Sequence, residues 1–430
     1  YHSSQLFIHE NSSYLVYDVF EVRTMIEIRG KKNNAICFAS QIDEKALEQI
    51  KRMCDYDLTL ESQIRIMPDV HAGKGCTIGT TMTIVDKVCP NIVGVDIGCG
   101  MYAVKLLNKE IEFKKIDEVC SYIPSGMNVW DSPIESFDLT ELKCYSSLKK
   151  LSHLEKSLGT LGGGNHFIEI EQSKSGDYYL VIHSGSRNLG KQVAEIYQRR
   201  AINLHRGWDE YILRRQEIIK EYKEQGKSQE INQVLEKLKE GYGTLDIPED
   251  LCWLYGEALN DYLHDIEICQ KYAMRNRELI ANMIMDKTSL TAYDSFHTIH
   301  NYIDVNEMIL RKGAIRAVKG EKVLIPMNMK DGSIIGIGKG NKEWNYSAPH
   351  GAGRILSRKQ AKEMLDINEY KESMEGIYTT SISLDTLDEA PQAYKSVEDI
   401  LDIVKETIDV IEVLKPVYNY KEHGNETRNY

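Results

Sequence analysis

Short apolar, β-branched runs alternate with glycine-rich turns from Met25 to about Leu107. Apolar positions that recur at every second residue between such turns are typical of strands. The pattern predicts a first strand that opens at Met25, a helix near Glu44–Asp55, and strands at the three runs Thr80–Val85, Ile92–Val95 and Met101–Val104. The glycines gather around polar side chains, which is typical of a strand scaffold that carries a site on its loops.

The middle of the chain changes to longer periodic segments. Residues 110–160 predict polar helices, whereas Leu161–Glu171 and Tyr178–His183 predict strands that each carry a histidine. Charged segments with a helical period then follow over about residues 195–285. We interpret them as a solvated helical region that is inserted into the domain.

Strands, glycines and histidines return over residues 297–360, and Val397–Leu414 predicts a final amphipathic helix. The whole pattern predicts one large α+β domain over residues 25–421, followed by a polar tail at 422–430. Residues 1–24 begin with Tyr and precede Met25, so we predict that they are upstream or non-native sequence.

The composition of the chain excludes several classes of function. The chain has 430 residues, 42% of them hydrophobic, and a formal net charge of −12, which argues against a broad, non-specific polyanion binder. None of its nine cysteines forms a close CxxC pair, so they are interpreted as reduced thiols. No apolar run reaches the roughly 18 residues that cross a bilayer, and we therefore expect no membrane partner and a cytoplasmic location.

Five side chains beside glycine-rich or strand-end positions are candidate metal ligands. They are Asp96, Cys99, His166, His183 and His300. Five donors of mixed type suit two ions that share the Cys99 thiolate, and these donors fit zinc, manganese or cobalt alike. The motif Asp96-Ile-Gly-Cys99 also fits an aspartate that caps its own turn beside an inert core cysteine, and a lone histidine such as His166 is often structural.

A second candidate site surrounds His350, which precedes Gly351 and Gly353. An open glycine backbone offers amides to a phosphate, and Arg354 and Arg358 are four residues apart on the following helix. This arrangement indicates a nucleophile or a phosphate-binding loop, although a glycine turn followed by two surface arginines has the same sequence.

Further polar residues are candidates for contact with an RNA backbone. A turn near residue 70 brings together Asp69, His71 and Lys74, and Arg187 follows the His183 strand in the segment Ser-Gly-Ser-Arg. Ionisable groups on turns of this kind contact phosphates.

Taken together, five motifs resemble those of the RtcB-type ligases of tRNA splicing and RNA repair. They are Pro68-Asp-Val-His-Ala-Gly-Lys-Gly, Val95-Asp-Ile-Gly-Cys-Gly-Met, Gly164-Asn-His, His183-Ser-Gly-Ser-Arg and His350-Gly-Ala-Gly-Arg, in order along Met25–Lys421. The resemblance implies strand layers around a dinuclear metal site. It also implies a GTP- and Mn²⁺-dependent ligase that joins an RNA 3′-phosphate or 2′,3′-cyclic phosphate to a 5′-hydroxyl.

The resemblance also assigns roles to residues. One Mn²⁺ would be held by Cys99, His183 and His300 and the other by Asp96, Cys99 and His166, while His350 would carry the guanylate. The nucleotide would be bound by Asn165, His166, Phe167, Ile168, Glu169, His300, Asn301, Pro326, Met327, Asn328, Met329, Ser333, His350, Gly351, Ala352, Gly353 and Lys421. Its substrates would be broken tRNA or rRNA ends, with an activating protein as a further partner.

The chain departs from the family pattern in the guanylate pocket. The segment Pro326-Met-Asn-Met-Lys-Asp-Gly-Ser333 replaces a more usual Pro-Gly-Ser-Met-Gly-Thr-Ala-Ser, and Pro349 replaces a cysteine. These changes resemble a divergent bacterial branch that is associated with RNA repair. Two other functions stay open: a metal-dependent phosphodiesterase that opens cyclic phosphates without GTP, and an RNA-end sensor without turnover.

Overall fold

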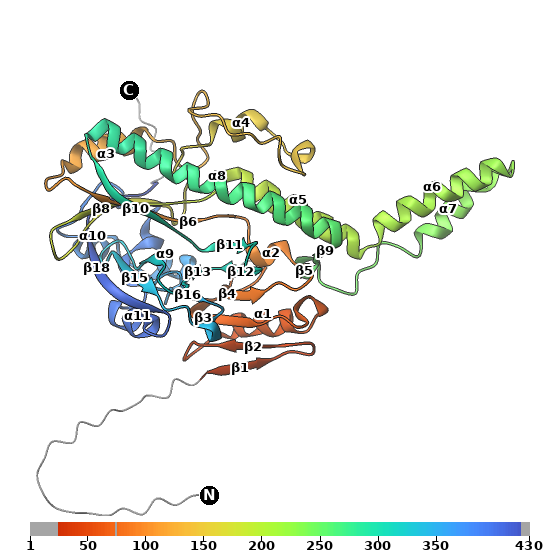
Figure 1. The fold of residues 1–430 in the computed structure, drawn as a ribbon, viewed down its shortest axis with the longest axis horizontal. Coiled ribbons are helices and arrows are strands. Elements are labelled where there is room, and N and C mark those ends of the chain that lie inside the picture. Colours follow the sequence, from red (N-terminus) through yellow and green to blue (C-terminus); the bar gives the residue numbers. More distant parts are fainter. Residues whose placement is uncertain (1–24, 74, 423–430) are drawn as a thin grey trace, which may run out of the picture.

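Two β-sheets form the frame of the computed structural model, which describes residues 25–73 and 75–422 (Figure 1). The six-stranded sheet contains, in spatial order, β1 (Ile26–Arg29), β2 (Asn34–Cys37), β3 (Ile64–His71), β4 (Ile78–Thr83), β12 (Ile309–Lys312) and β11 (Asn301–Asp304). The eight-stranded sheet contains β10 (Ala292–Ile299), β6 (Gly100–Leu106), β8 (Tyr178–Ser184), β7 (Phe167–Gln172), β18 (Ile408–Tyr420), β15 (Ser333–Gly338) and β14 (Lys322–Pro326), with β17 (Tyr378–Thr379) beside β18. Two short ribbons pair β13 (Ala314–Arg316) with β16 (Ser347–Pro349) and β5 (Lys87–Val88) with β9 (Leu254–Tyr255).

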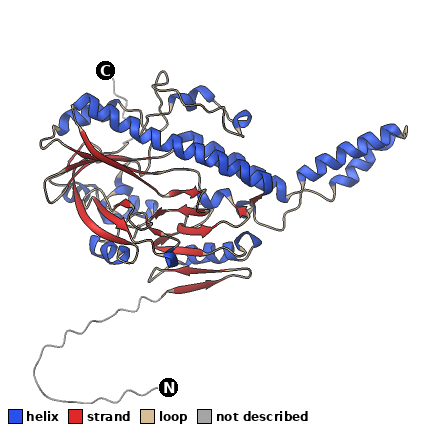
Figure 2. Ribbon diagram, viewed as in Figure 1, coloured by secondary structure: helices blue, strands red, loops and turns tan. Residues whose placement is uncertain are grey.

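Helices surround this frame, and the longest ones run along one side of it (Figure 2). They are α1 (Glu44–Cys54), α2 (Pro90–Val93), α3 (Phe113–Tyr122), α4 (Leu151–Lys156), α5 (Arg187–His205), α6 (Trp208–Glu224), α7 (Ile231–Lys239), α8 (Gly256–Thr288), α9 (Arg358–Met364), α10 (Ile367–Ser373) and α11 (Val397–Val404). Short 3-10 turns occupy Asp57–Thr59, Tyr145–Ser147, Ser228–Glu230, Glu249–Leu251, Lys342–Trp344, Leu387–Glu389 and Pro391–Ala393. The predicted α+β class is confirmed. No helix in the described part of the chain is long and apolar enough to cross a membrane.

The eight-stranded sheet separates a core from a functional face because successive side chains of a strand point to opposite sides. On β7, Ile168 and Ile170 belong to the same buried cluster as Ile280 of α8. Phe167 points the other way, into a second cluster that includes Met101. Helix α8 therefore covers one face of the sheet, and the polar residues that alternate with the isoleucines lie on the other.

Two predictions of secondary structure are wrong. Ile92–Val95 was expected to be a strand, but Pro90–Val93 forms the short helix α2. Pro90 stands in its first turn, where a missing N–H costs nothing, and Gly94 ends it with a φ of 95°. Val397–Leu414 was expected to be one helix, but α11 ends at Val404 and β18 begins at Ile408.

The second error has a clear physical reason. Ile408, Val410 and Val413 are β-branched residues. Their spacing in the sequence, considered without the rest of the fold, fits an amphipathic helix. They form a strand because β15 pairs with them on one side, and β7 pairs with the later part of β18. Backbone pairing with distant segments decides the conformation of such an ambiguous run.

The predicted solvated insertion over about residues 195–285 is smaller in the structure. Helices α6 and α7 project from the body as a hairpin (Figure 1), and Ile218 is the buried residue of α6. By contrast, α8 buries fourteen residues, among them Asn276 and Arg277, and α5 is also largely covered on one face. The charged residues of α8 made it look solvated in the sequence. A helix that packs against the core on one face keeps polar residues on the other face.

Two further predicted boundaries are corrected. The 110–160 segment contains α3 and α4, but loops and turns occupy most of the rest. The strand expected at Leu161–Glu171 begins only at Phe167, since Gly162 and Gly164 hold the preceding loop at φ values of 88° and 74°. Residues 1–24 and 423–430 lie outside the described residues, so the predicted extension and nearly all of the predicted polar tail are not observed.

Candidate metal and nucleotide site

The five predicted metal ligands converge at one edge of the two sheets. Asp96 and Cys99 lie on the loop between α2 and β6, and the Cys99 amide donates to the Asp96 carbonyl at 3.2 Å, which closes a tight turn. His166 precedes β7, His183 lies near the end of β8, and His300 lies between β10 and β11. Segments from four parts of the chain therefore supply this cluster.

The donor atoms of the cluster lie close enough together to share a metal ion. The Cys99 Sγ lies 3.5 Å from His166 Nε2 and 3.3 Å from His183 Nε2. His183 Nε2 lies 3.4 Å from His300 Nε2, and Asp96 Oδ2 lies 3.0 Å from His166 Nε2. Cys99, His166 and His183 alone place three donor atoms within 4.8 Å of one another, as a shared ion requires.

Hydrogen bonds fix two of the imidazoles in the tautomer that binds metals. His166 Nδ1 lies 2.9 Å from the Leu161 carbonyl oxygen, and His183 Nδ1 lies 3.0 Å from that of Asn165. A carbonyl only accepts, so each Nδ1 carries the proton and each Nε2 presents a lone pair to the cluster. Burial lowers the pKa of His183 and His300 well below the usual value, which keeps both rings neutral.

His183 Nε2 and His300 Nε2 lie 3.4 Å apart, close enough for their lone pairs to bind one ion. The positions of these donor atoms therefore fit a bound metal ion. Mixed nitrogen, sulfur and oxygen donors do not by themselves select one divalent ion.

Helix α8 holds the loops that carry these ligands. The fully buried Arg277 donates through Nη1 to the carbonyls of Gly98, at 2.8 Å, and Ser184, at 2.7 Å, which are the neighbours of Cys99 and His183. Burial raises the pKa of the Cys99 thiol well above its usual value, and the positive charge of Arg277 opposes this rise. Sequence analysis missed this role because Arg277 lies within an ordinary charged helical pattern.

His350 lies next to the metal cluster, and Asp69 orients it. Its ring centroid is 5.2 Å from that of His300. Its Nδ1 lies 2.7 Å from Asp69 Oδ2, and its backbone amide donates to the same oxygen at 3.2 Å. The side chain of Asp69 is 1% exposed and that of His350 22% exposed. A buried carboxylate that accepts from Nδ1 leaves Nε2 unprotonated, which is the arrangement of an activated nucleophile.

Asp69 was predicted to contact RNA, and the structure instead gives it this partner within the protein. His71 also turns inward, since its Nδ1 lies 3.0 Å from the Asp69 carbonyl oxygen, and burial lowers its pKa. Lys74 lies outside the described residues.

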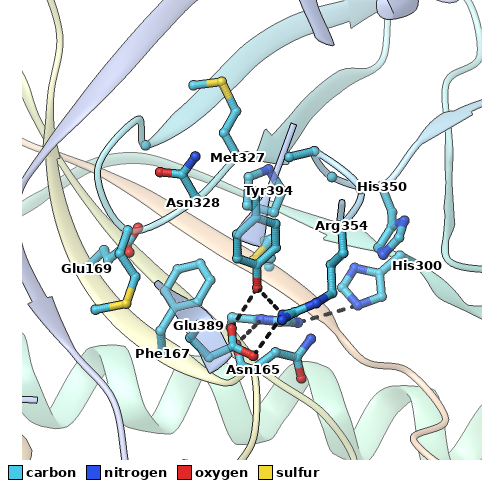
Figure 3. Close-up of a pocket in the computed structure, with 18 of the residues that line it drawn as sticks. Asn165, Phe167, Glu169, His300, Met327, Asn328, His350, Arg354, Glu389 and Tyr394 are labelled. Atoms are coloured by element: carbon cyan, nitrogen blue, oxygen red, sulfur yellow. Dashed lines mark hydrogen bonds and ion pairs between the residues drawn. The ribbon is translucent and has the colours of Figure 1, made fainter. Parts of the chain in front are cut away.

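A pocket opens beside His350 and the cluster (Figure 3). Most of the residues predicted to bind nucleotide line it: Asn165, Phe167, Glu169, His300, Pro326, Met327, Asn328, Met329, His350, Gly351, Ala352, Gly353 and Lys421. Four predicted residues do not line it: His166, Ile168, Asn301 and Ser333. Ile168 points into the core under α8 because it alternates with Phe167, and Asn301 lines a different pocket.

Cations and carboxylates share the far end of this pocket (Figure 3). Glu389 is buried and binds Lys421 Nζ at 2.9 Å and Arg358 Nη1 at 2.6 Å, while Tyr394 donates its hydroxyl to Glu389 at 2.8 Å. Arg354 Nη1 donates to the Tyr394 hydroxyl at 3.0 Å. Sequence analysis missed Glu389 and Tyr394, since they stand on irregular turns more than thirty residues from the histidine motif, and no local pattern marks them.

Arg187 was predicted to contact phosphate, and in the structure its side chain makes hydrogen bonds to other parts of the protein. It donates through Nη2 to the Gly126 carbonyl at 2.7 Å and through Nε to Thr160 Oγ1 at 3.1 Å. Its guanidinium thus braces the loop that carries the Leu161 carbonyl against His166. Arg354 and Arg358 line the pocket, as phosphate ligands would.

The unusual 326–333 segment is ordered by its own side chains. Asn328 Oδ1 accepts from the amides of Lys330 and Asp331 at 3.0 and 2.9 Å, so much of its hydrogen bonding closes its own turn. Ser333 is fully buried and donates to Glu171 Oε1 at 2.8 Å. The retained serine therefore lies behind the pocket wall.

Glu169 and Glu171 form a buried carboxylate pair on one face of β7. Burial is the largest cause that raises the pKa of Glu169, to about 7, and it raises that of Glu171 well above its usual range, with the charge of Glu169 adding to it. The folded state thus keeps protons that the unfolded state releases, and stability falls as pH rises through this window.

We expect Glu171→Gln to flatten this fall. Glutamine still accepts from Ser333 but holds no titrating proton, and each such proton contributes about 1.4 kcal/mol per pH unit between the unfolded and folded pKa values. Urea unfolding from pH 5 to pH 8 measures the slope for both proteins, with the exposed Glu118→Gln as the control. Parallel slopes for wild type and Glu171→Gln would contradict the interpretation that the folded state keeps a proton on Glu171.

Comparison with known proteins agrees with this geometry. Residues 49–152 and 135–422 match the family model described as RtcB, tRNA-splicing ligase RtcB. The chain is 28% identical over 397 residues to the RNA-splicing ligase RtcB of Escherichia coli strain K12, which covers 82% of this chain and 88% of that protein. It is 27% identical over 436 residues to the tRNA-splicing ligase RtcB of Aeropyrum pernix, covering 79% and 83%.

The RNA-splicing ligase RtcB2 of another Escherichia coli strain is 26% identical over 390 residues, covering 83% of this chain and 87% of that protein. The family match extends over most of the described chain and includes all the residues of the metal cluster and His350. The chain therefore belongs to the RtcB family.

Proposed function

We propose that the protein is a GTP- and Mn²⁺-dependent RNA ligase that joins 3′-phosphate or 2′,3′-cyclic phosphate ends to 5′-hydroxyl ends. The observation that carries the proposal is the position of His350. Its ring lies beside the cluster of metal donors and lines the pocket, and Asp69 holds its Nδ1 at 2.7 Å. The names of the relatives, which are RNA- or tRNA-splicing ligases, support the substrate class.

In the first step, His350 Nε2 attacks the α-phosphorus of GTP. A P–N bond forms, the P–O bond to the β-phosphate breaks, and pyrophosphate leaves with the bonding electrons. Asp69 stabilises the positive charge that the ring develops as its Nε2 attacks the phosphorus. Arg354 and Arg358, which line the pocket, are placed to balance phosphate charge, although each is held by a carboxylate in the described structure.

In the next two steps the guanylate is transferred and then released. An oxygen of the RNA 3′-phosphate attacks the guanylate phosphorus and frees His350, and a 5′-hydroxyl then displaces GMP to form the phosphodiester. The metals, when bound, would neutralise phosphate charge. Cys99, His183 and His300 would hold one ion, and Asp96, Cys99 and His166 the other.

The guanine base would lie among the apolar residues of the pocket. Phe167, Met327 and Met329 supply apolar surface, and Glu169 and Lys421 supply polar contacts at the base edge. The physiological substrates we propose are broken tRNA or rRNA ends, and an activating protein would assist turnover.

A GTP-dependence experiment tests the proposal against its alternatives. The protein is incubated with Mn²⁺, a 3′-phosphate RNA and a 5′-hydroxyl RNA, with and without α-labelled GTP. We expect joining only with GTP, an acid-labile label on the protein, and more than one junction per protein molecule. Equal processing of a cyclic phosphate without GTP would favour the phosphodiesterase. Tight binding of RNA ends with no junction and no label would favour the end sensor.

A further inference from the structure

A second cavity approaches the metal cluster from outside the nucleotide pocket. It has a volume of about 1120 Å³ and lies between α2, α5 and the strand pair β11–β12. None of the residues that line it also lines the nucleotide pocket. Asp96 opens into this cavity, and its side chain is 33% exposed, whereas that of His166 is 5% exposed. The metal donors are therefore reached from two pockets.

A thin wall of backbone separates these two pockets. His300 lines the nucleotide pocket, and its neighbour Asn301 lines the second cavity. Lys312 lines the second cavity, and its neighbour Gly313 lies between the two pockets. An added Cβ at Gly313 would meet Ile78 Cγ2 of the second cavity and would lie 3.2 Å from His350 Cε1 of the nucleotide pocket. Gly313 donates its amide to the His300 carbonyl at 2.7 Å and to Asn301 Oδ1 at 2.9 Å, which ties the wall together.

The geometry of phosphoryl transfer indicates why two pockets would reach the metal donors. In an in-line displacement the attacking oxygen and the leaving oxygen lie on opposite sides of the phosphorus. In the sealing step the leaving group is GMP, whose base and ribose would occupy the nucleotide pocket. The attacking 5′-hydroxyl must then approach the phosphorus from the side away from the nucleotide pocket, and the second cavity, which Asp96 lines, reaches the metal donors from outside that pocket.

The lining of the cavity suits the end of a nucleic acid strand. Val95 is 37% exposed and supplies apolar surface, with the buried Val93 and Ala194 behind it, and Arg199 supplies an exposed cation. No ion pair or hydrogen bond of the Arg199 guanidinium is found among the residues that the structure describes. Grooves that bind single-stranded nucleic acid place such cations on its phosphates.

The other charged groups of the cavity are already engaged. Lys312 Nζ donates to the Asn91 carbonyl at 3.2 Å, and Glu195 lies 4.0 Å from Lys191. Asp96 belongs to the metal cluster. Arg199 is therefore the group through which a phosphate is best recognised.

We propose that this cavity binds the 5′-hydroxyl-terminal nucleotide of the acceptor RNA strand, and that Arg199 contacts the first phosphates of that strand. The inference rests on the proposed ligase function. In the step that it serves, the 5′-oxygen forms a bond to the RNA 3′-phosphorus while the bond from that phosphorus to the GMP oxygen breaks. GMP leaves with the electron pair, and the hydroxyl proton passes to water.

The test separates the three chemical steps in Arg199→Ala, Arg199→Lys and a control. Labelled GTP alone measures guanylylation, a 3′-phosphate RNA alone measures formation of the RNA–guanylate, and titration with a 5′-hydroxyl strand measures sealing. Arg200→Ala is the matched control, because Arg200 is the next residue of α5 but pairs with Asp261 at 2.7 Å and does not line the cavity.

We expect Arg199→Ala to raise the KM for the 5′-hydroxyl strand about tenfold, the worth of one charge-assisted phosphate contact, and to leave the first two steps unchanged. Arg199→Lys should recover most of the loss, and the salt dependence of acceptor binding should fall by about 0.7 in log–log slope for Arg199→Ala. An unchanged acceptor KM, or an equal loss in all three steps, would overturn the inference. Absence of guanylylation in the wild type would instead overturn the proposed function on which it rests.

Discussion

His350→Ala is expected to give no covalent guanylate, with a loss of labelling and of sealing of at least about 10⁴-fold, since no other nucleophile replaces the ring nitrogen. Labelling with α-labelled GTP and Mn²⁺, read on an acid-free denaturing gel, measures it. His153→Ala is the matched control because His153 lies on α4, away from the pocket and the metal donors. A persistent label on His350→Ala at the wild-type level would show that another residue carries the guanylate.

A second variant, Asp69→Asn, tests how much the orientation of His350 contributes to guanylylation. Asp69→Asn keeps His350 but replaces the carboxylate that accepts from Nδ1 at 2.7 Å, so the ring loses both its fixed tautomer and its charge compensation. We expect guanylylation to slow by about 10² to 10⁴-fold while GTP binding changes little. The exposed Asp86→Asn should behave as wild type. Equal guanylylation rates for Asp69→Asn and wild type would show that Asp69 does not assist the reaction of His350.

Cys99→Ala is expected to remove both metal ions. Its Sγ lies 3.5 Å from one histidine nitrogen of the cluster and 3.3 Å from another, and in the proposed division of ligands this thiolate binds both ions. Loss of a shared ligand should weaken both ions, at least about 10²-fold each, whereas Asp96→Ala and His300→Ala should each weaken one. Equilibrium dialysis against Mn²⁺ with metal analysis counts the ions per chain.

The control for this series is Cys144→Ala, which removes another buried thiol far along the chain from the metal donors. Thermal unfolding without metal shows whether each variant is folded. Retention of one tightly bound Mn²⁺ in Cys99→Ala would refute the bridging thiolate, and equal loss of both ions in Asp96→Ala would refute the division of ligands.

The motifs that carry chemistry were visible in the sequence, because they lie on glycine-bounded turns where the local backbone dictates residue type. The convergence of Asp96, Cys99, His166, His183 and His300 agrees with the prediction that they form one cluster. Their roles as ligands stay a prediction until metal is bound. The most damaging errors were in segments such as Ile408–Tyr420, whose local pattern fits both a helix and a strand.

The α+β class, the RtcB resemblance and the histidine loops were predictable from the sequence, since glycine spacing and strand periodicity are local properties. Three other features became visible only in the folded chain: Asp69 contacts His350, Arg277 of a charged helix holds the loops of the candidate metal ligands, and Asn301 faces a different pocket from His300. Those facts depend on which distant segments pack together and on which side of a strand each residue lies. A linear pattern does not encode contacts across more than two hundred residues, such as the pairing of Asp69 with His350, and only the packed sheets bring these side chains together.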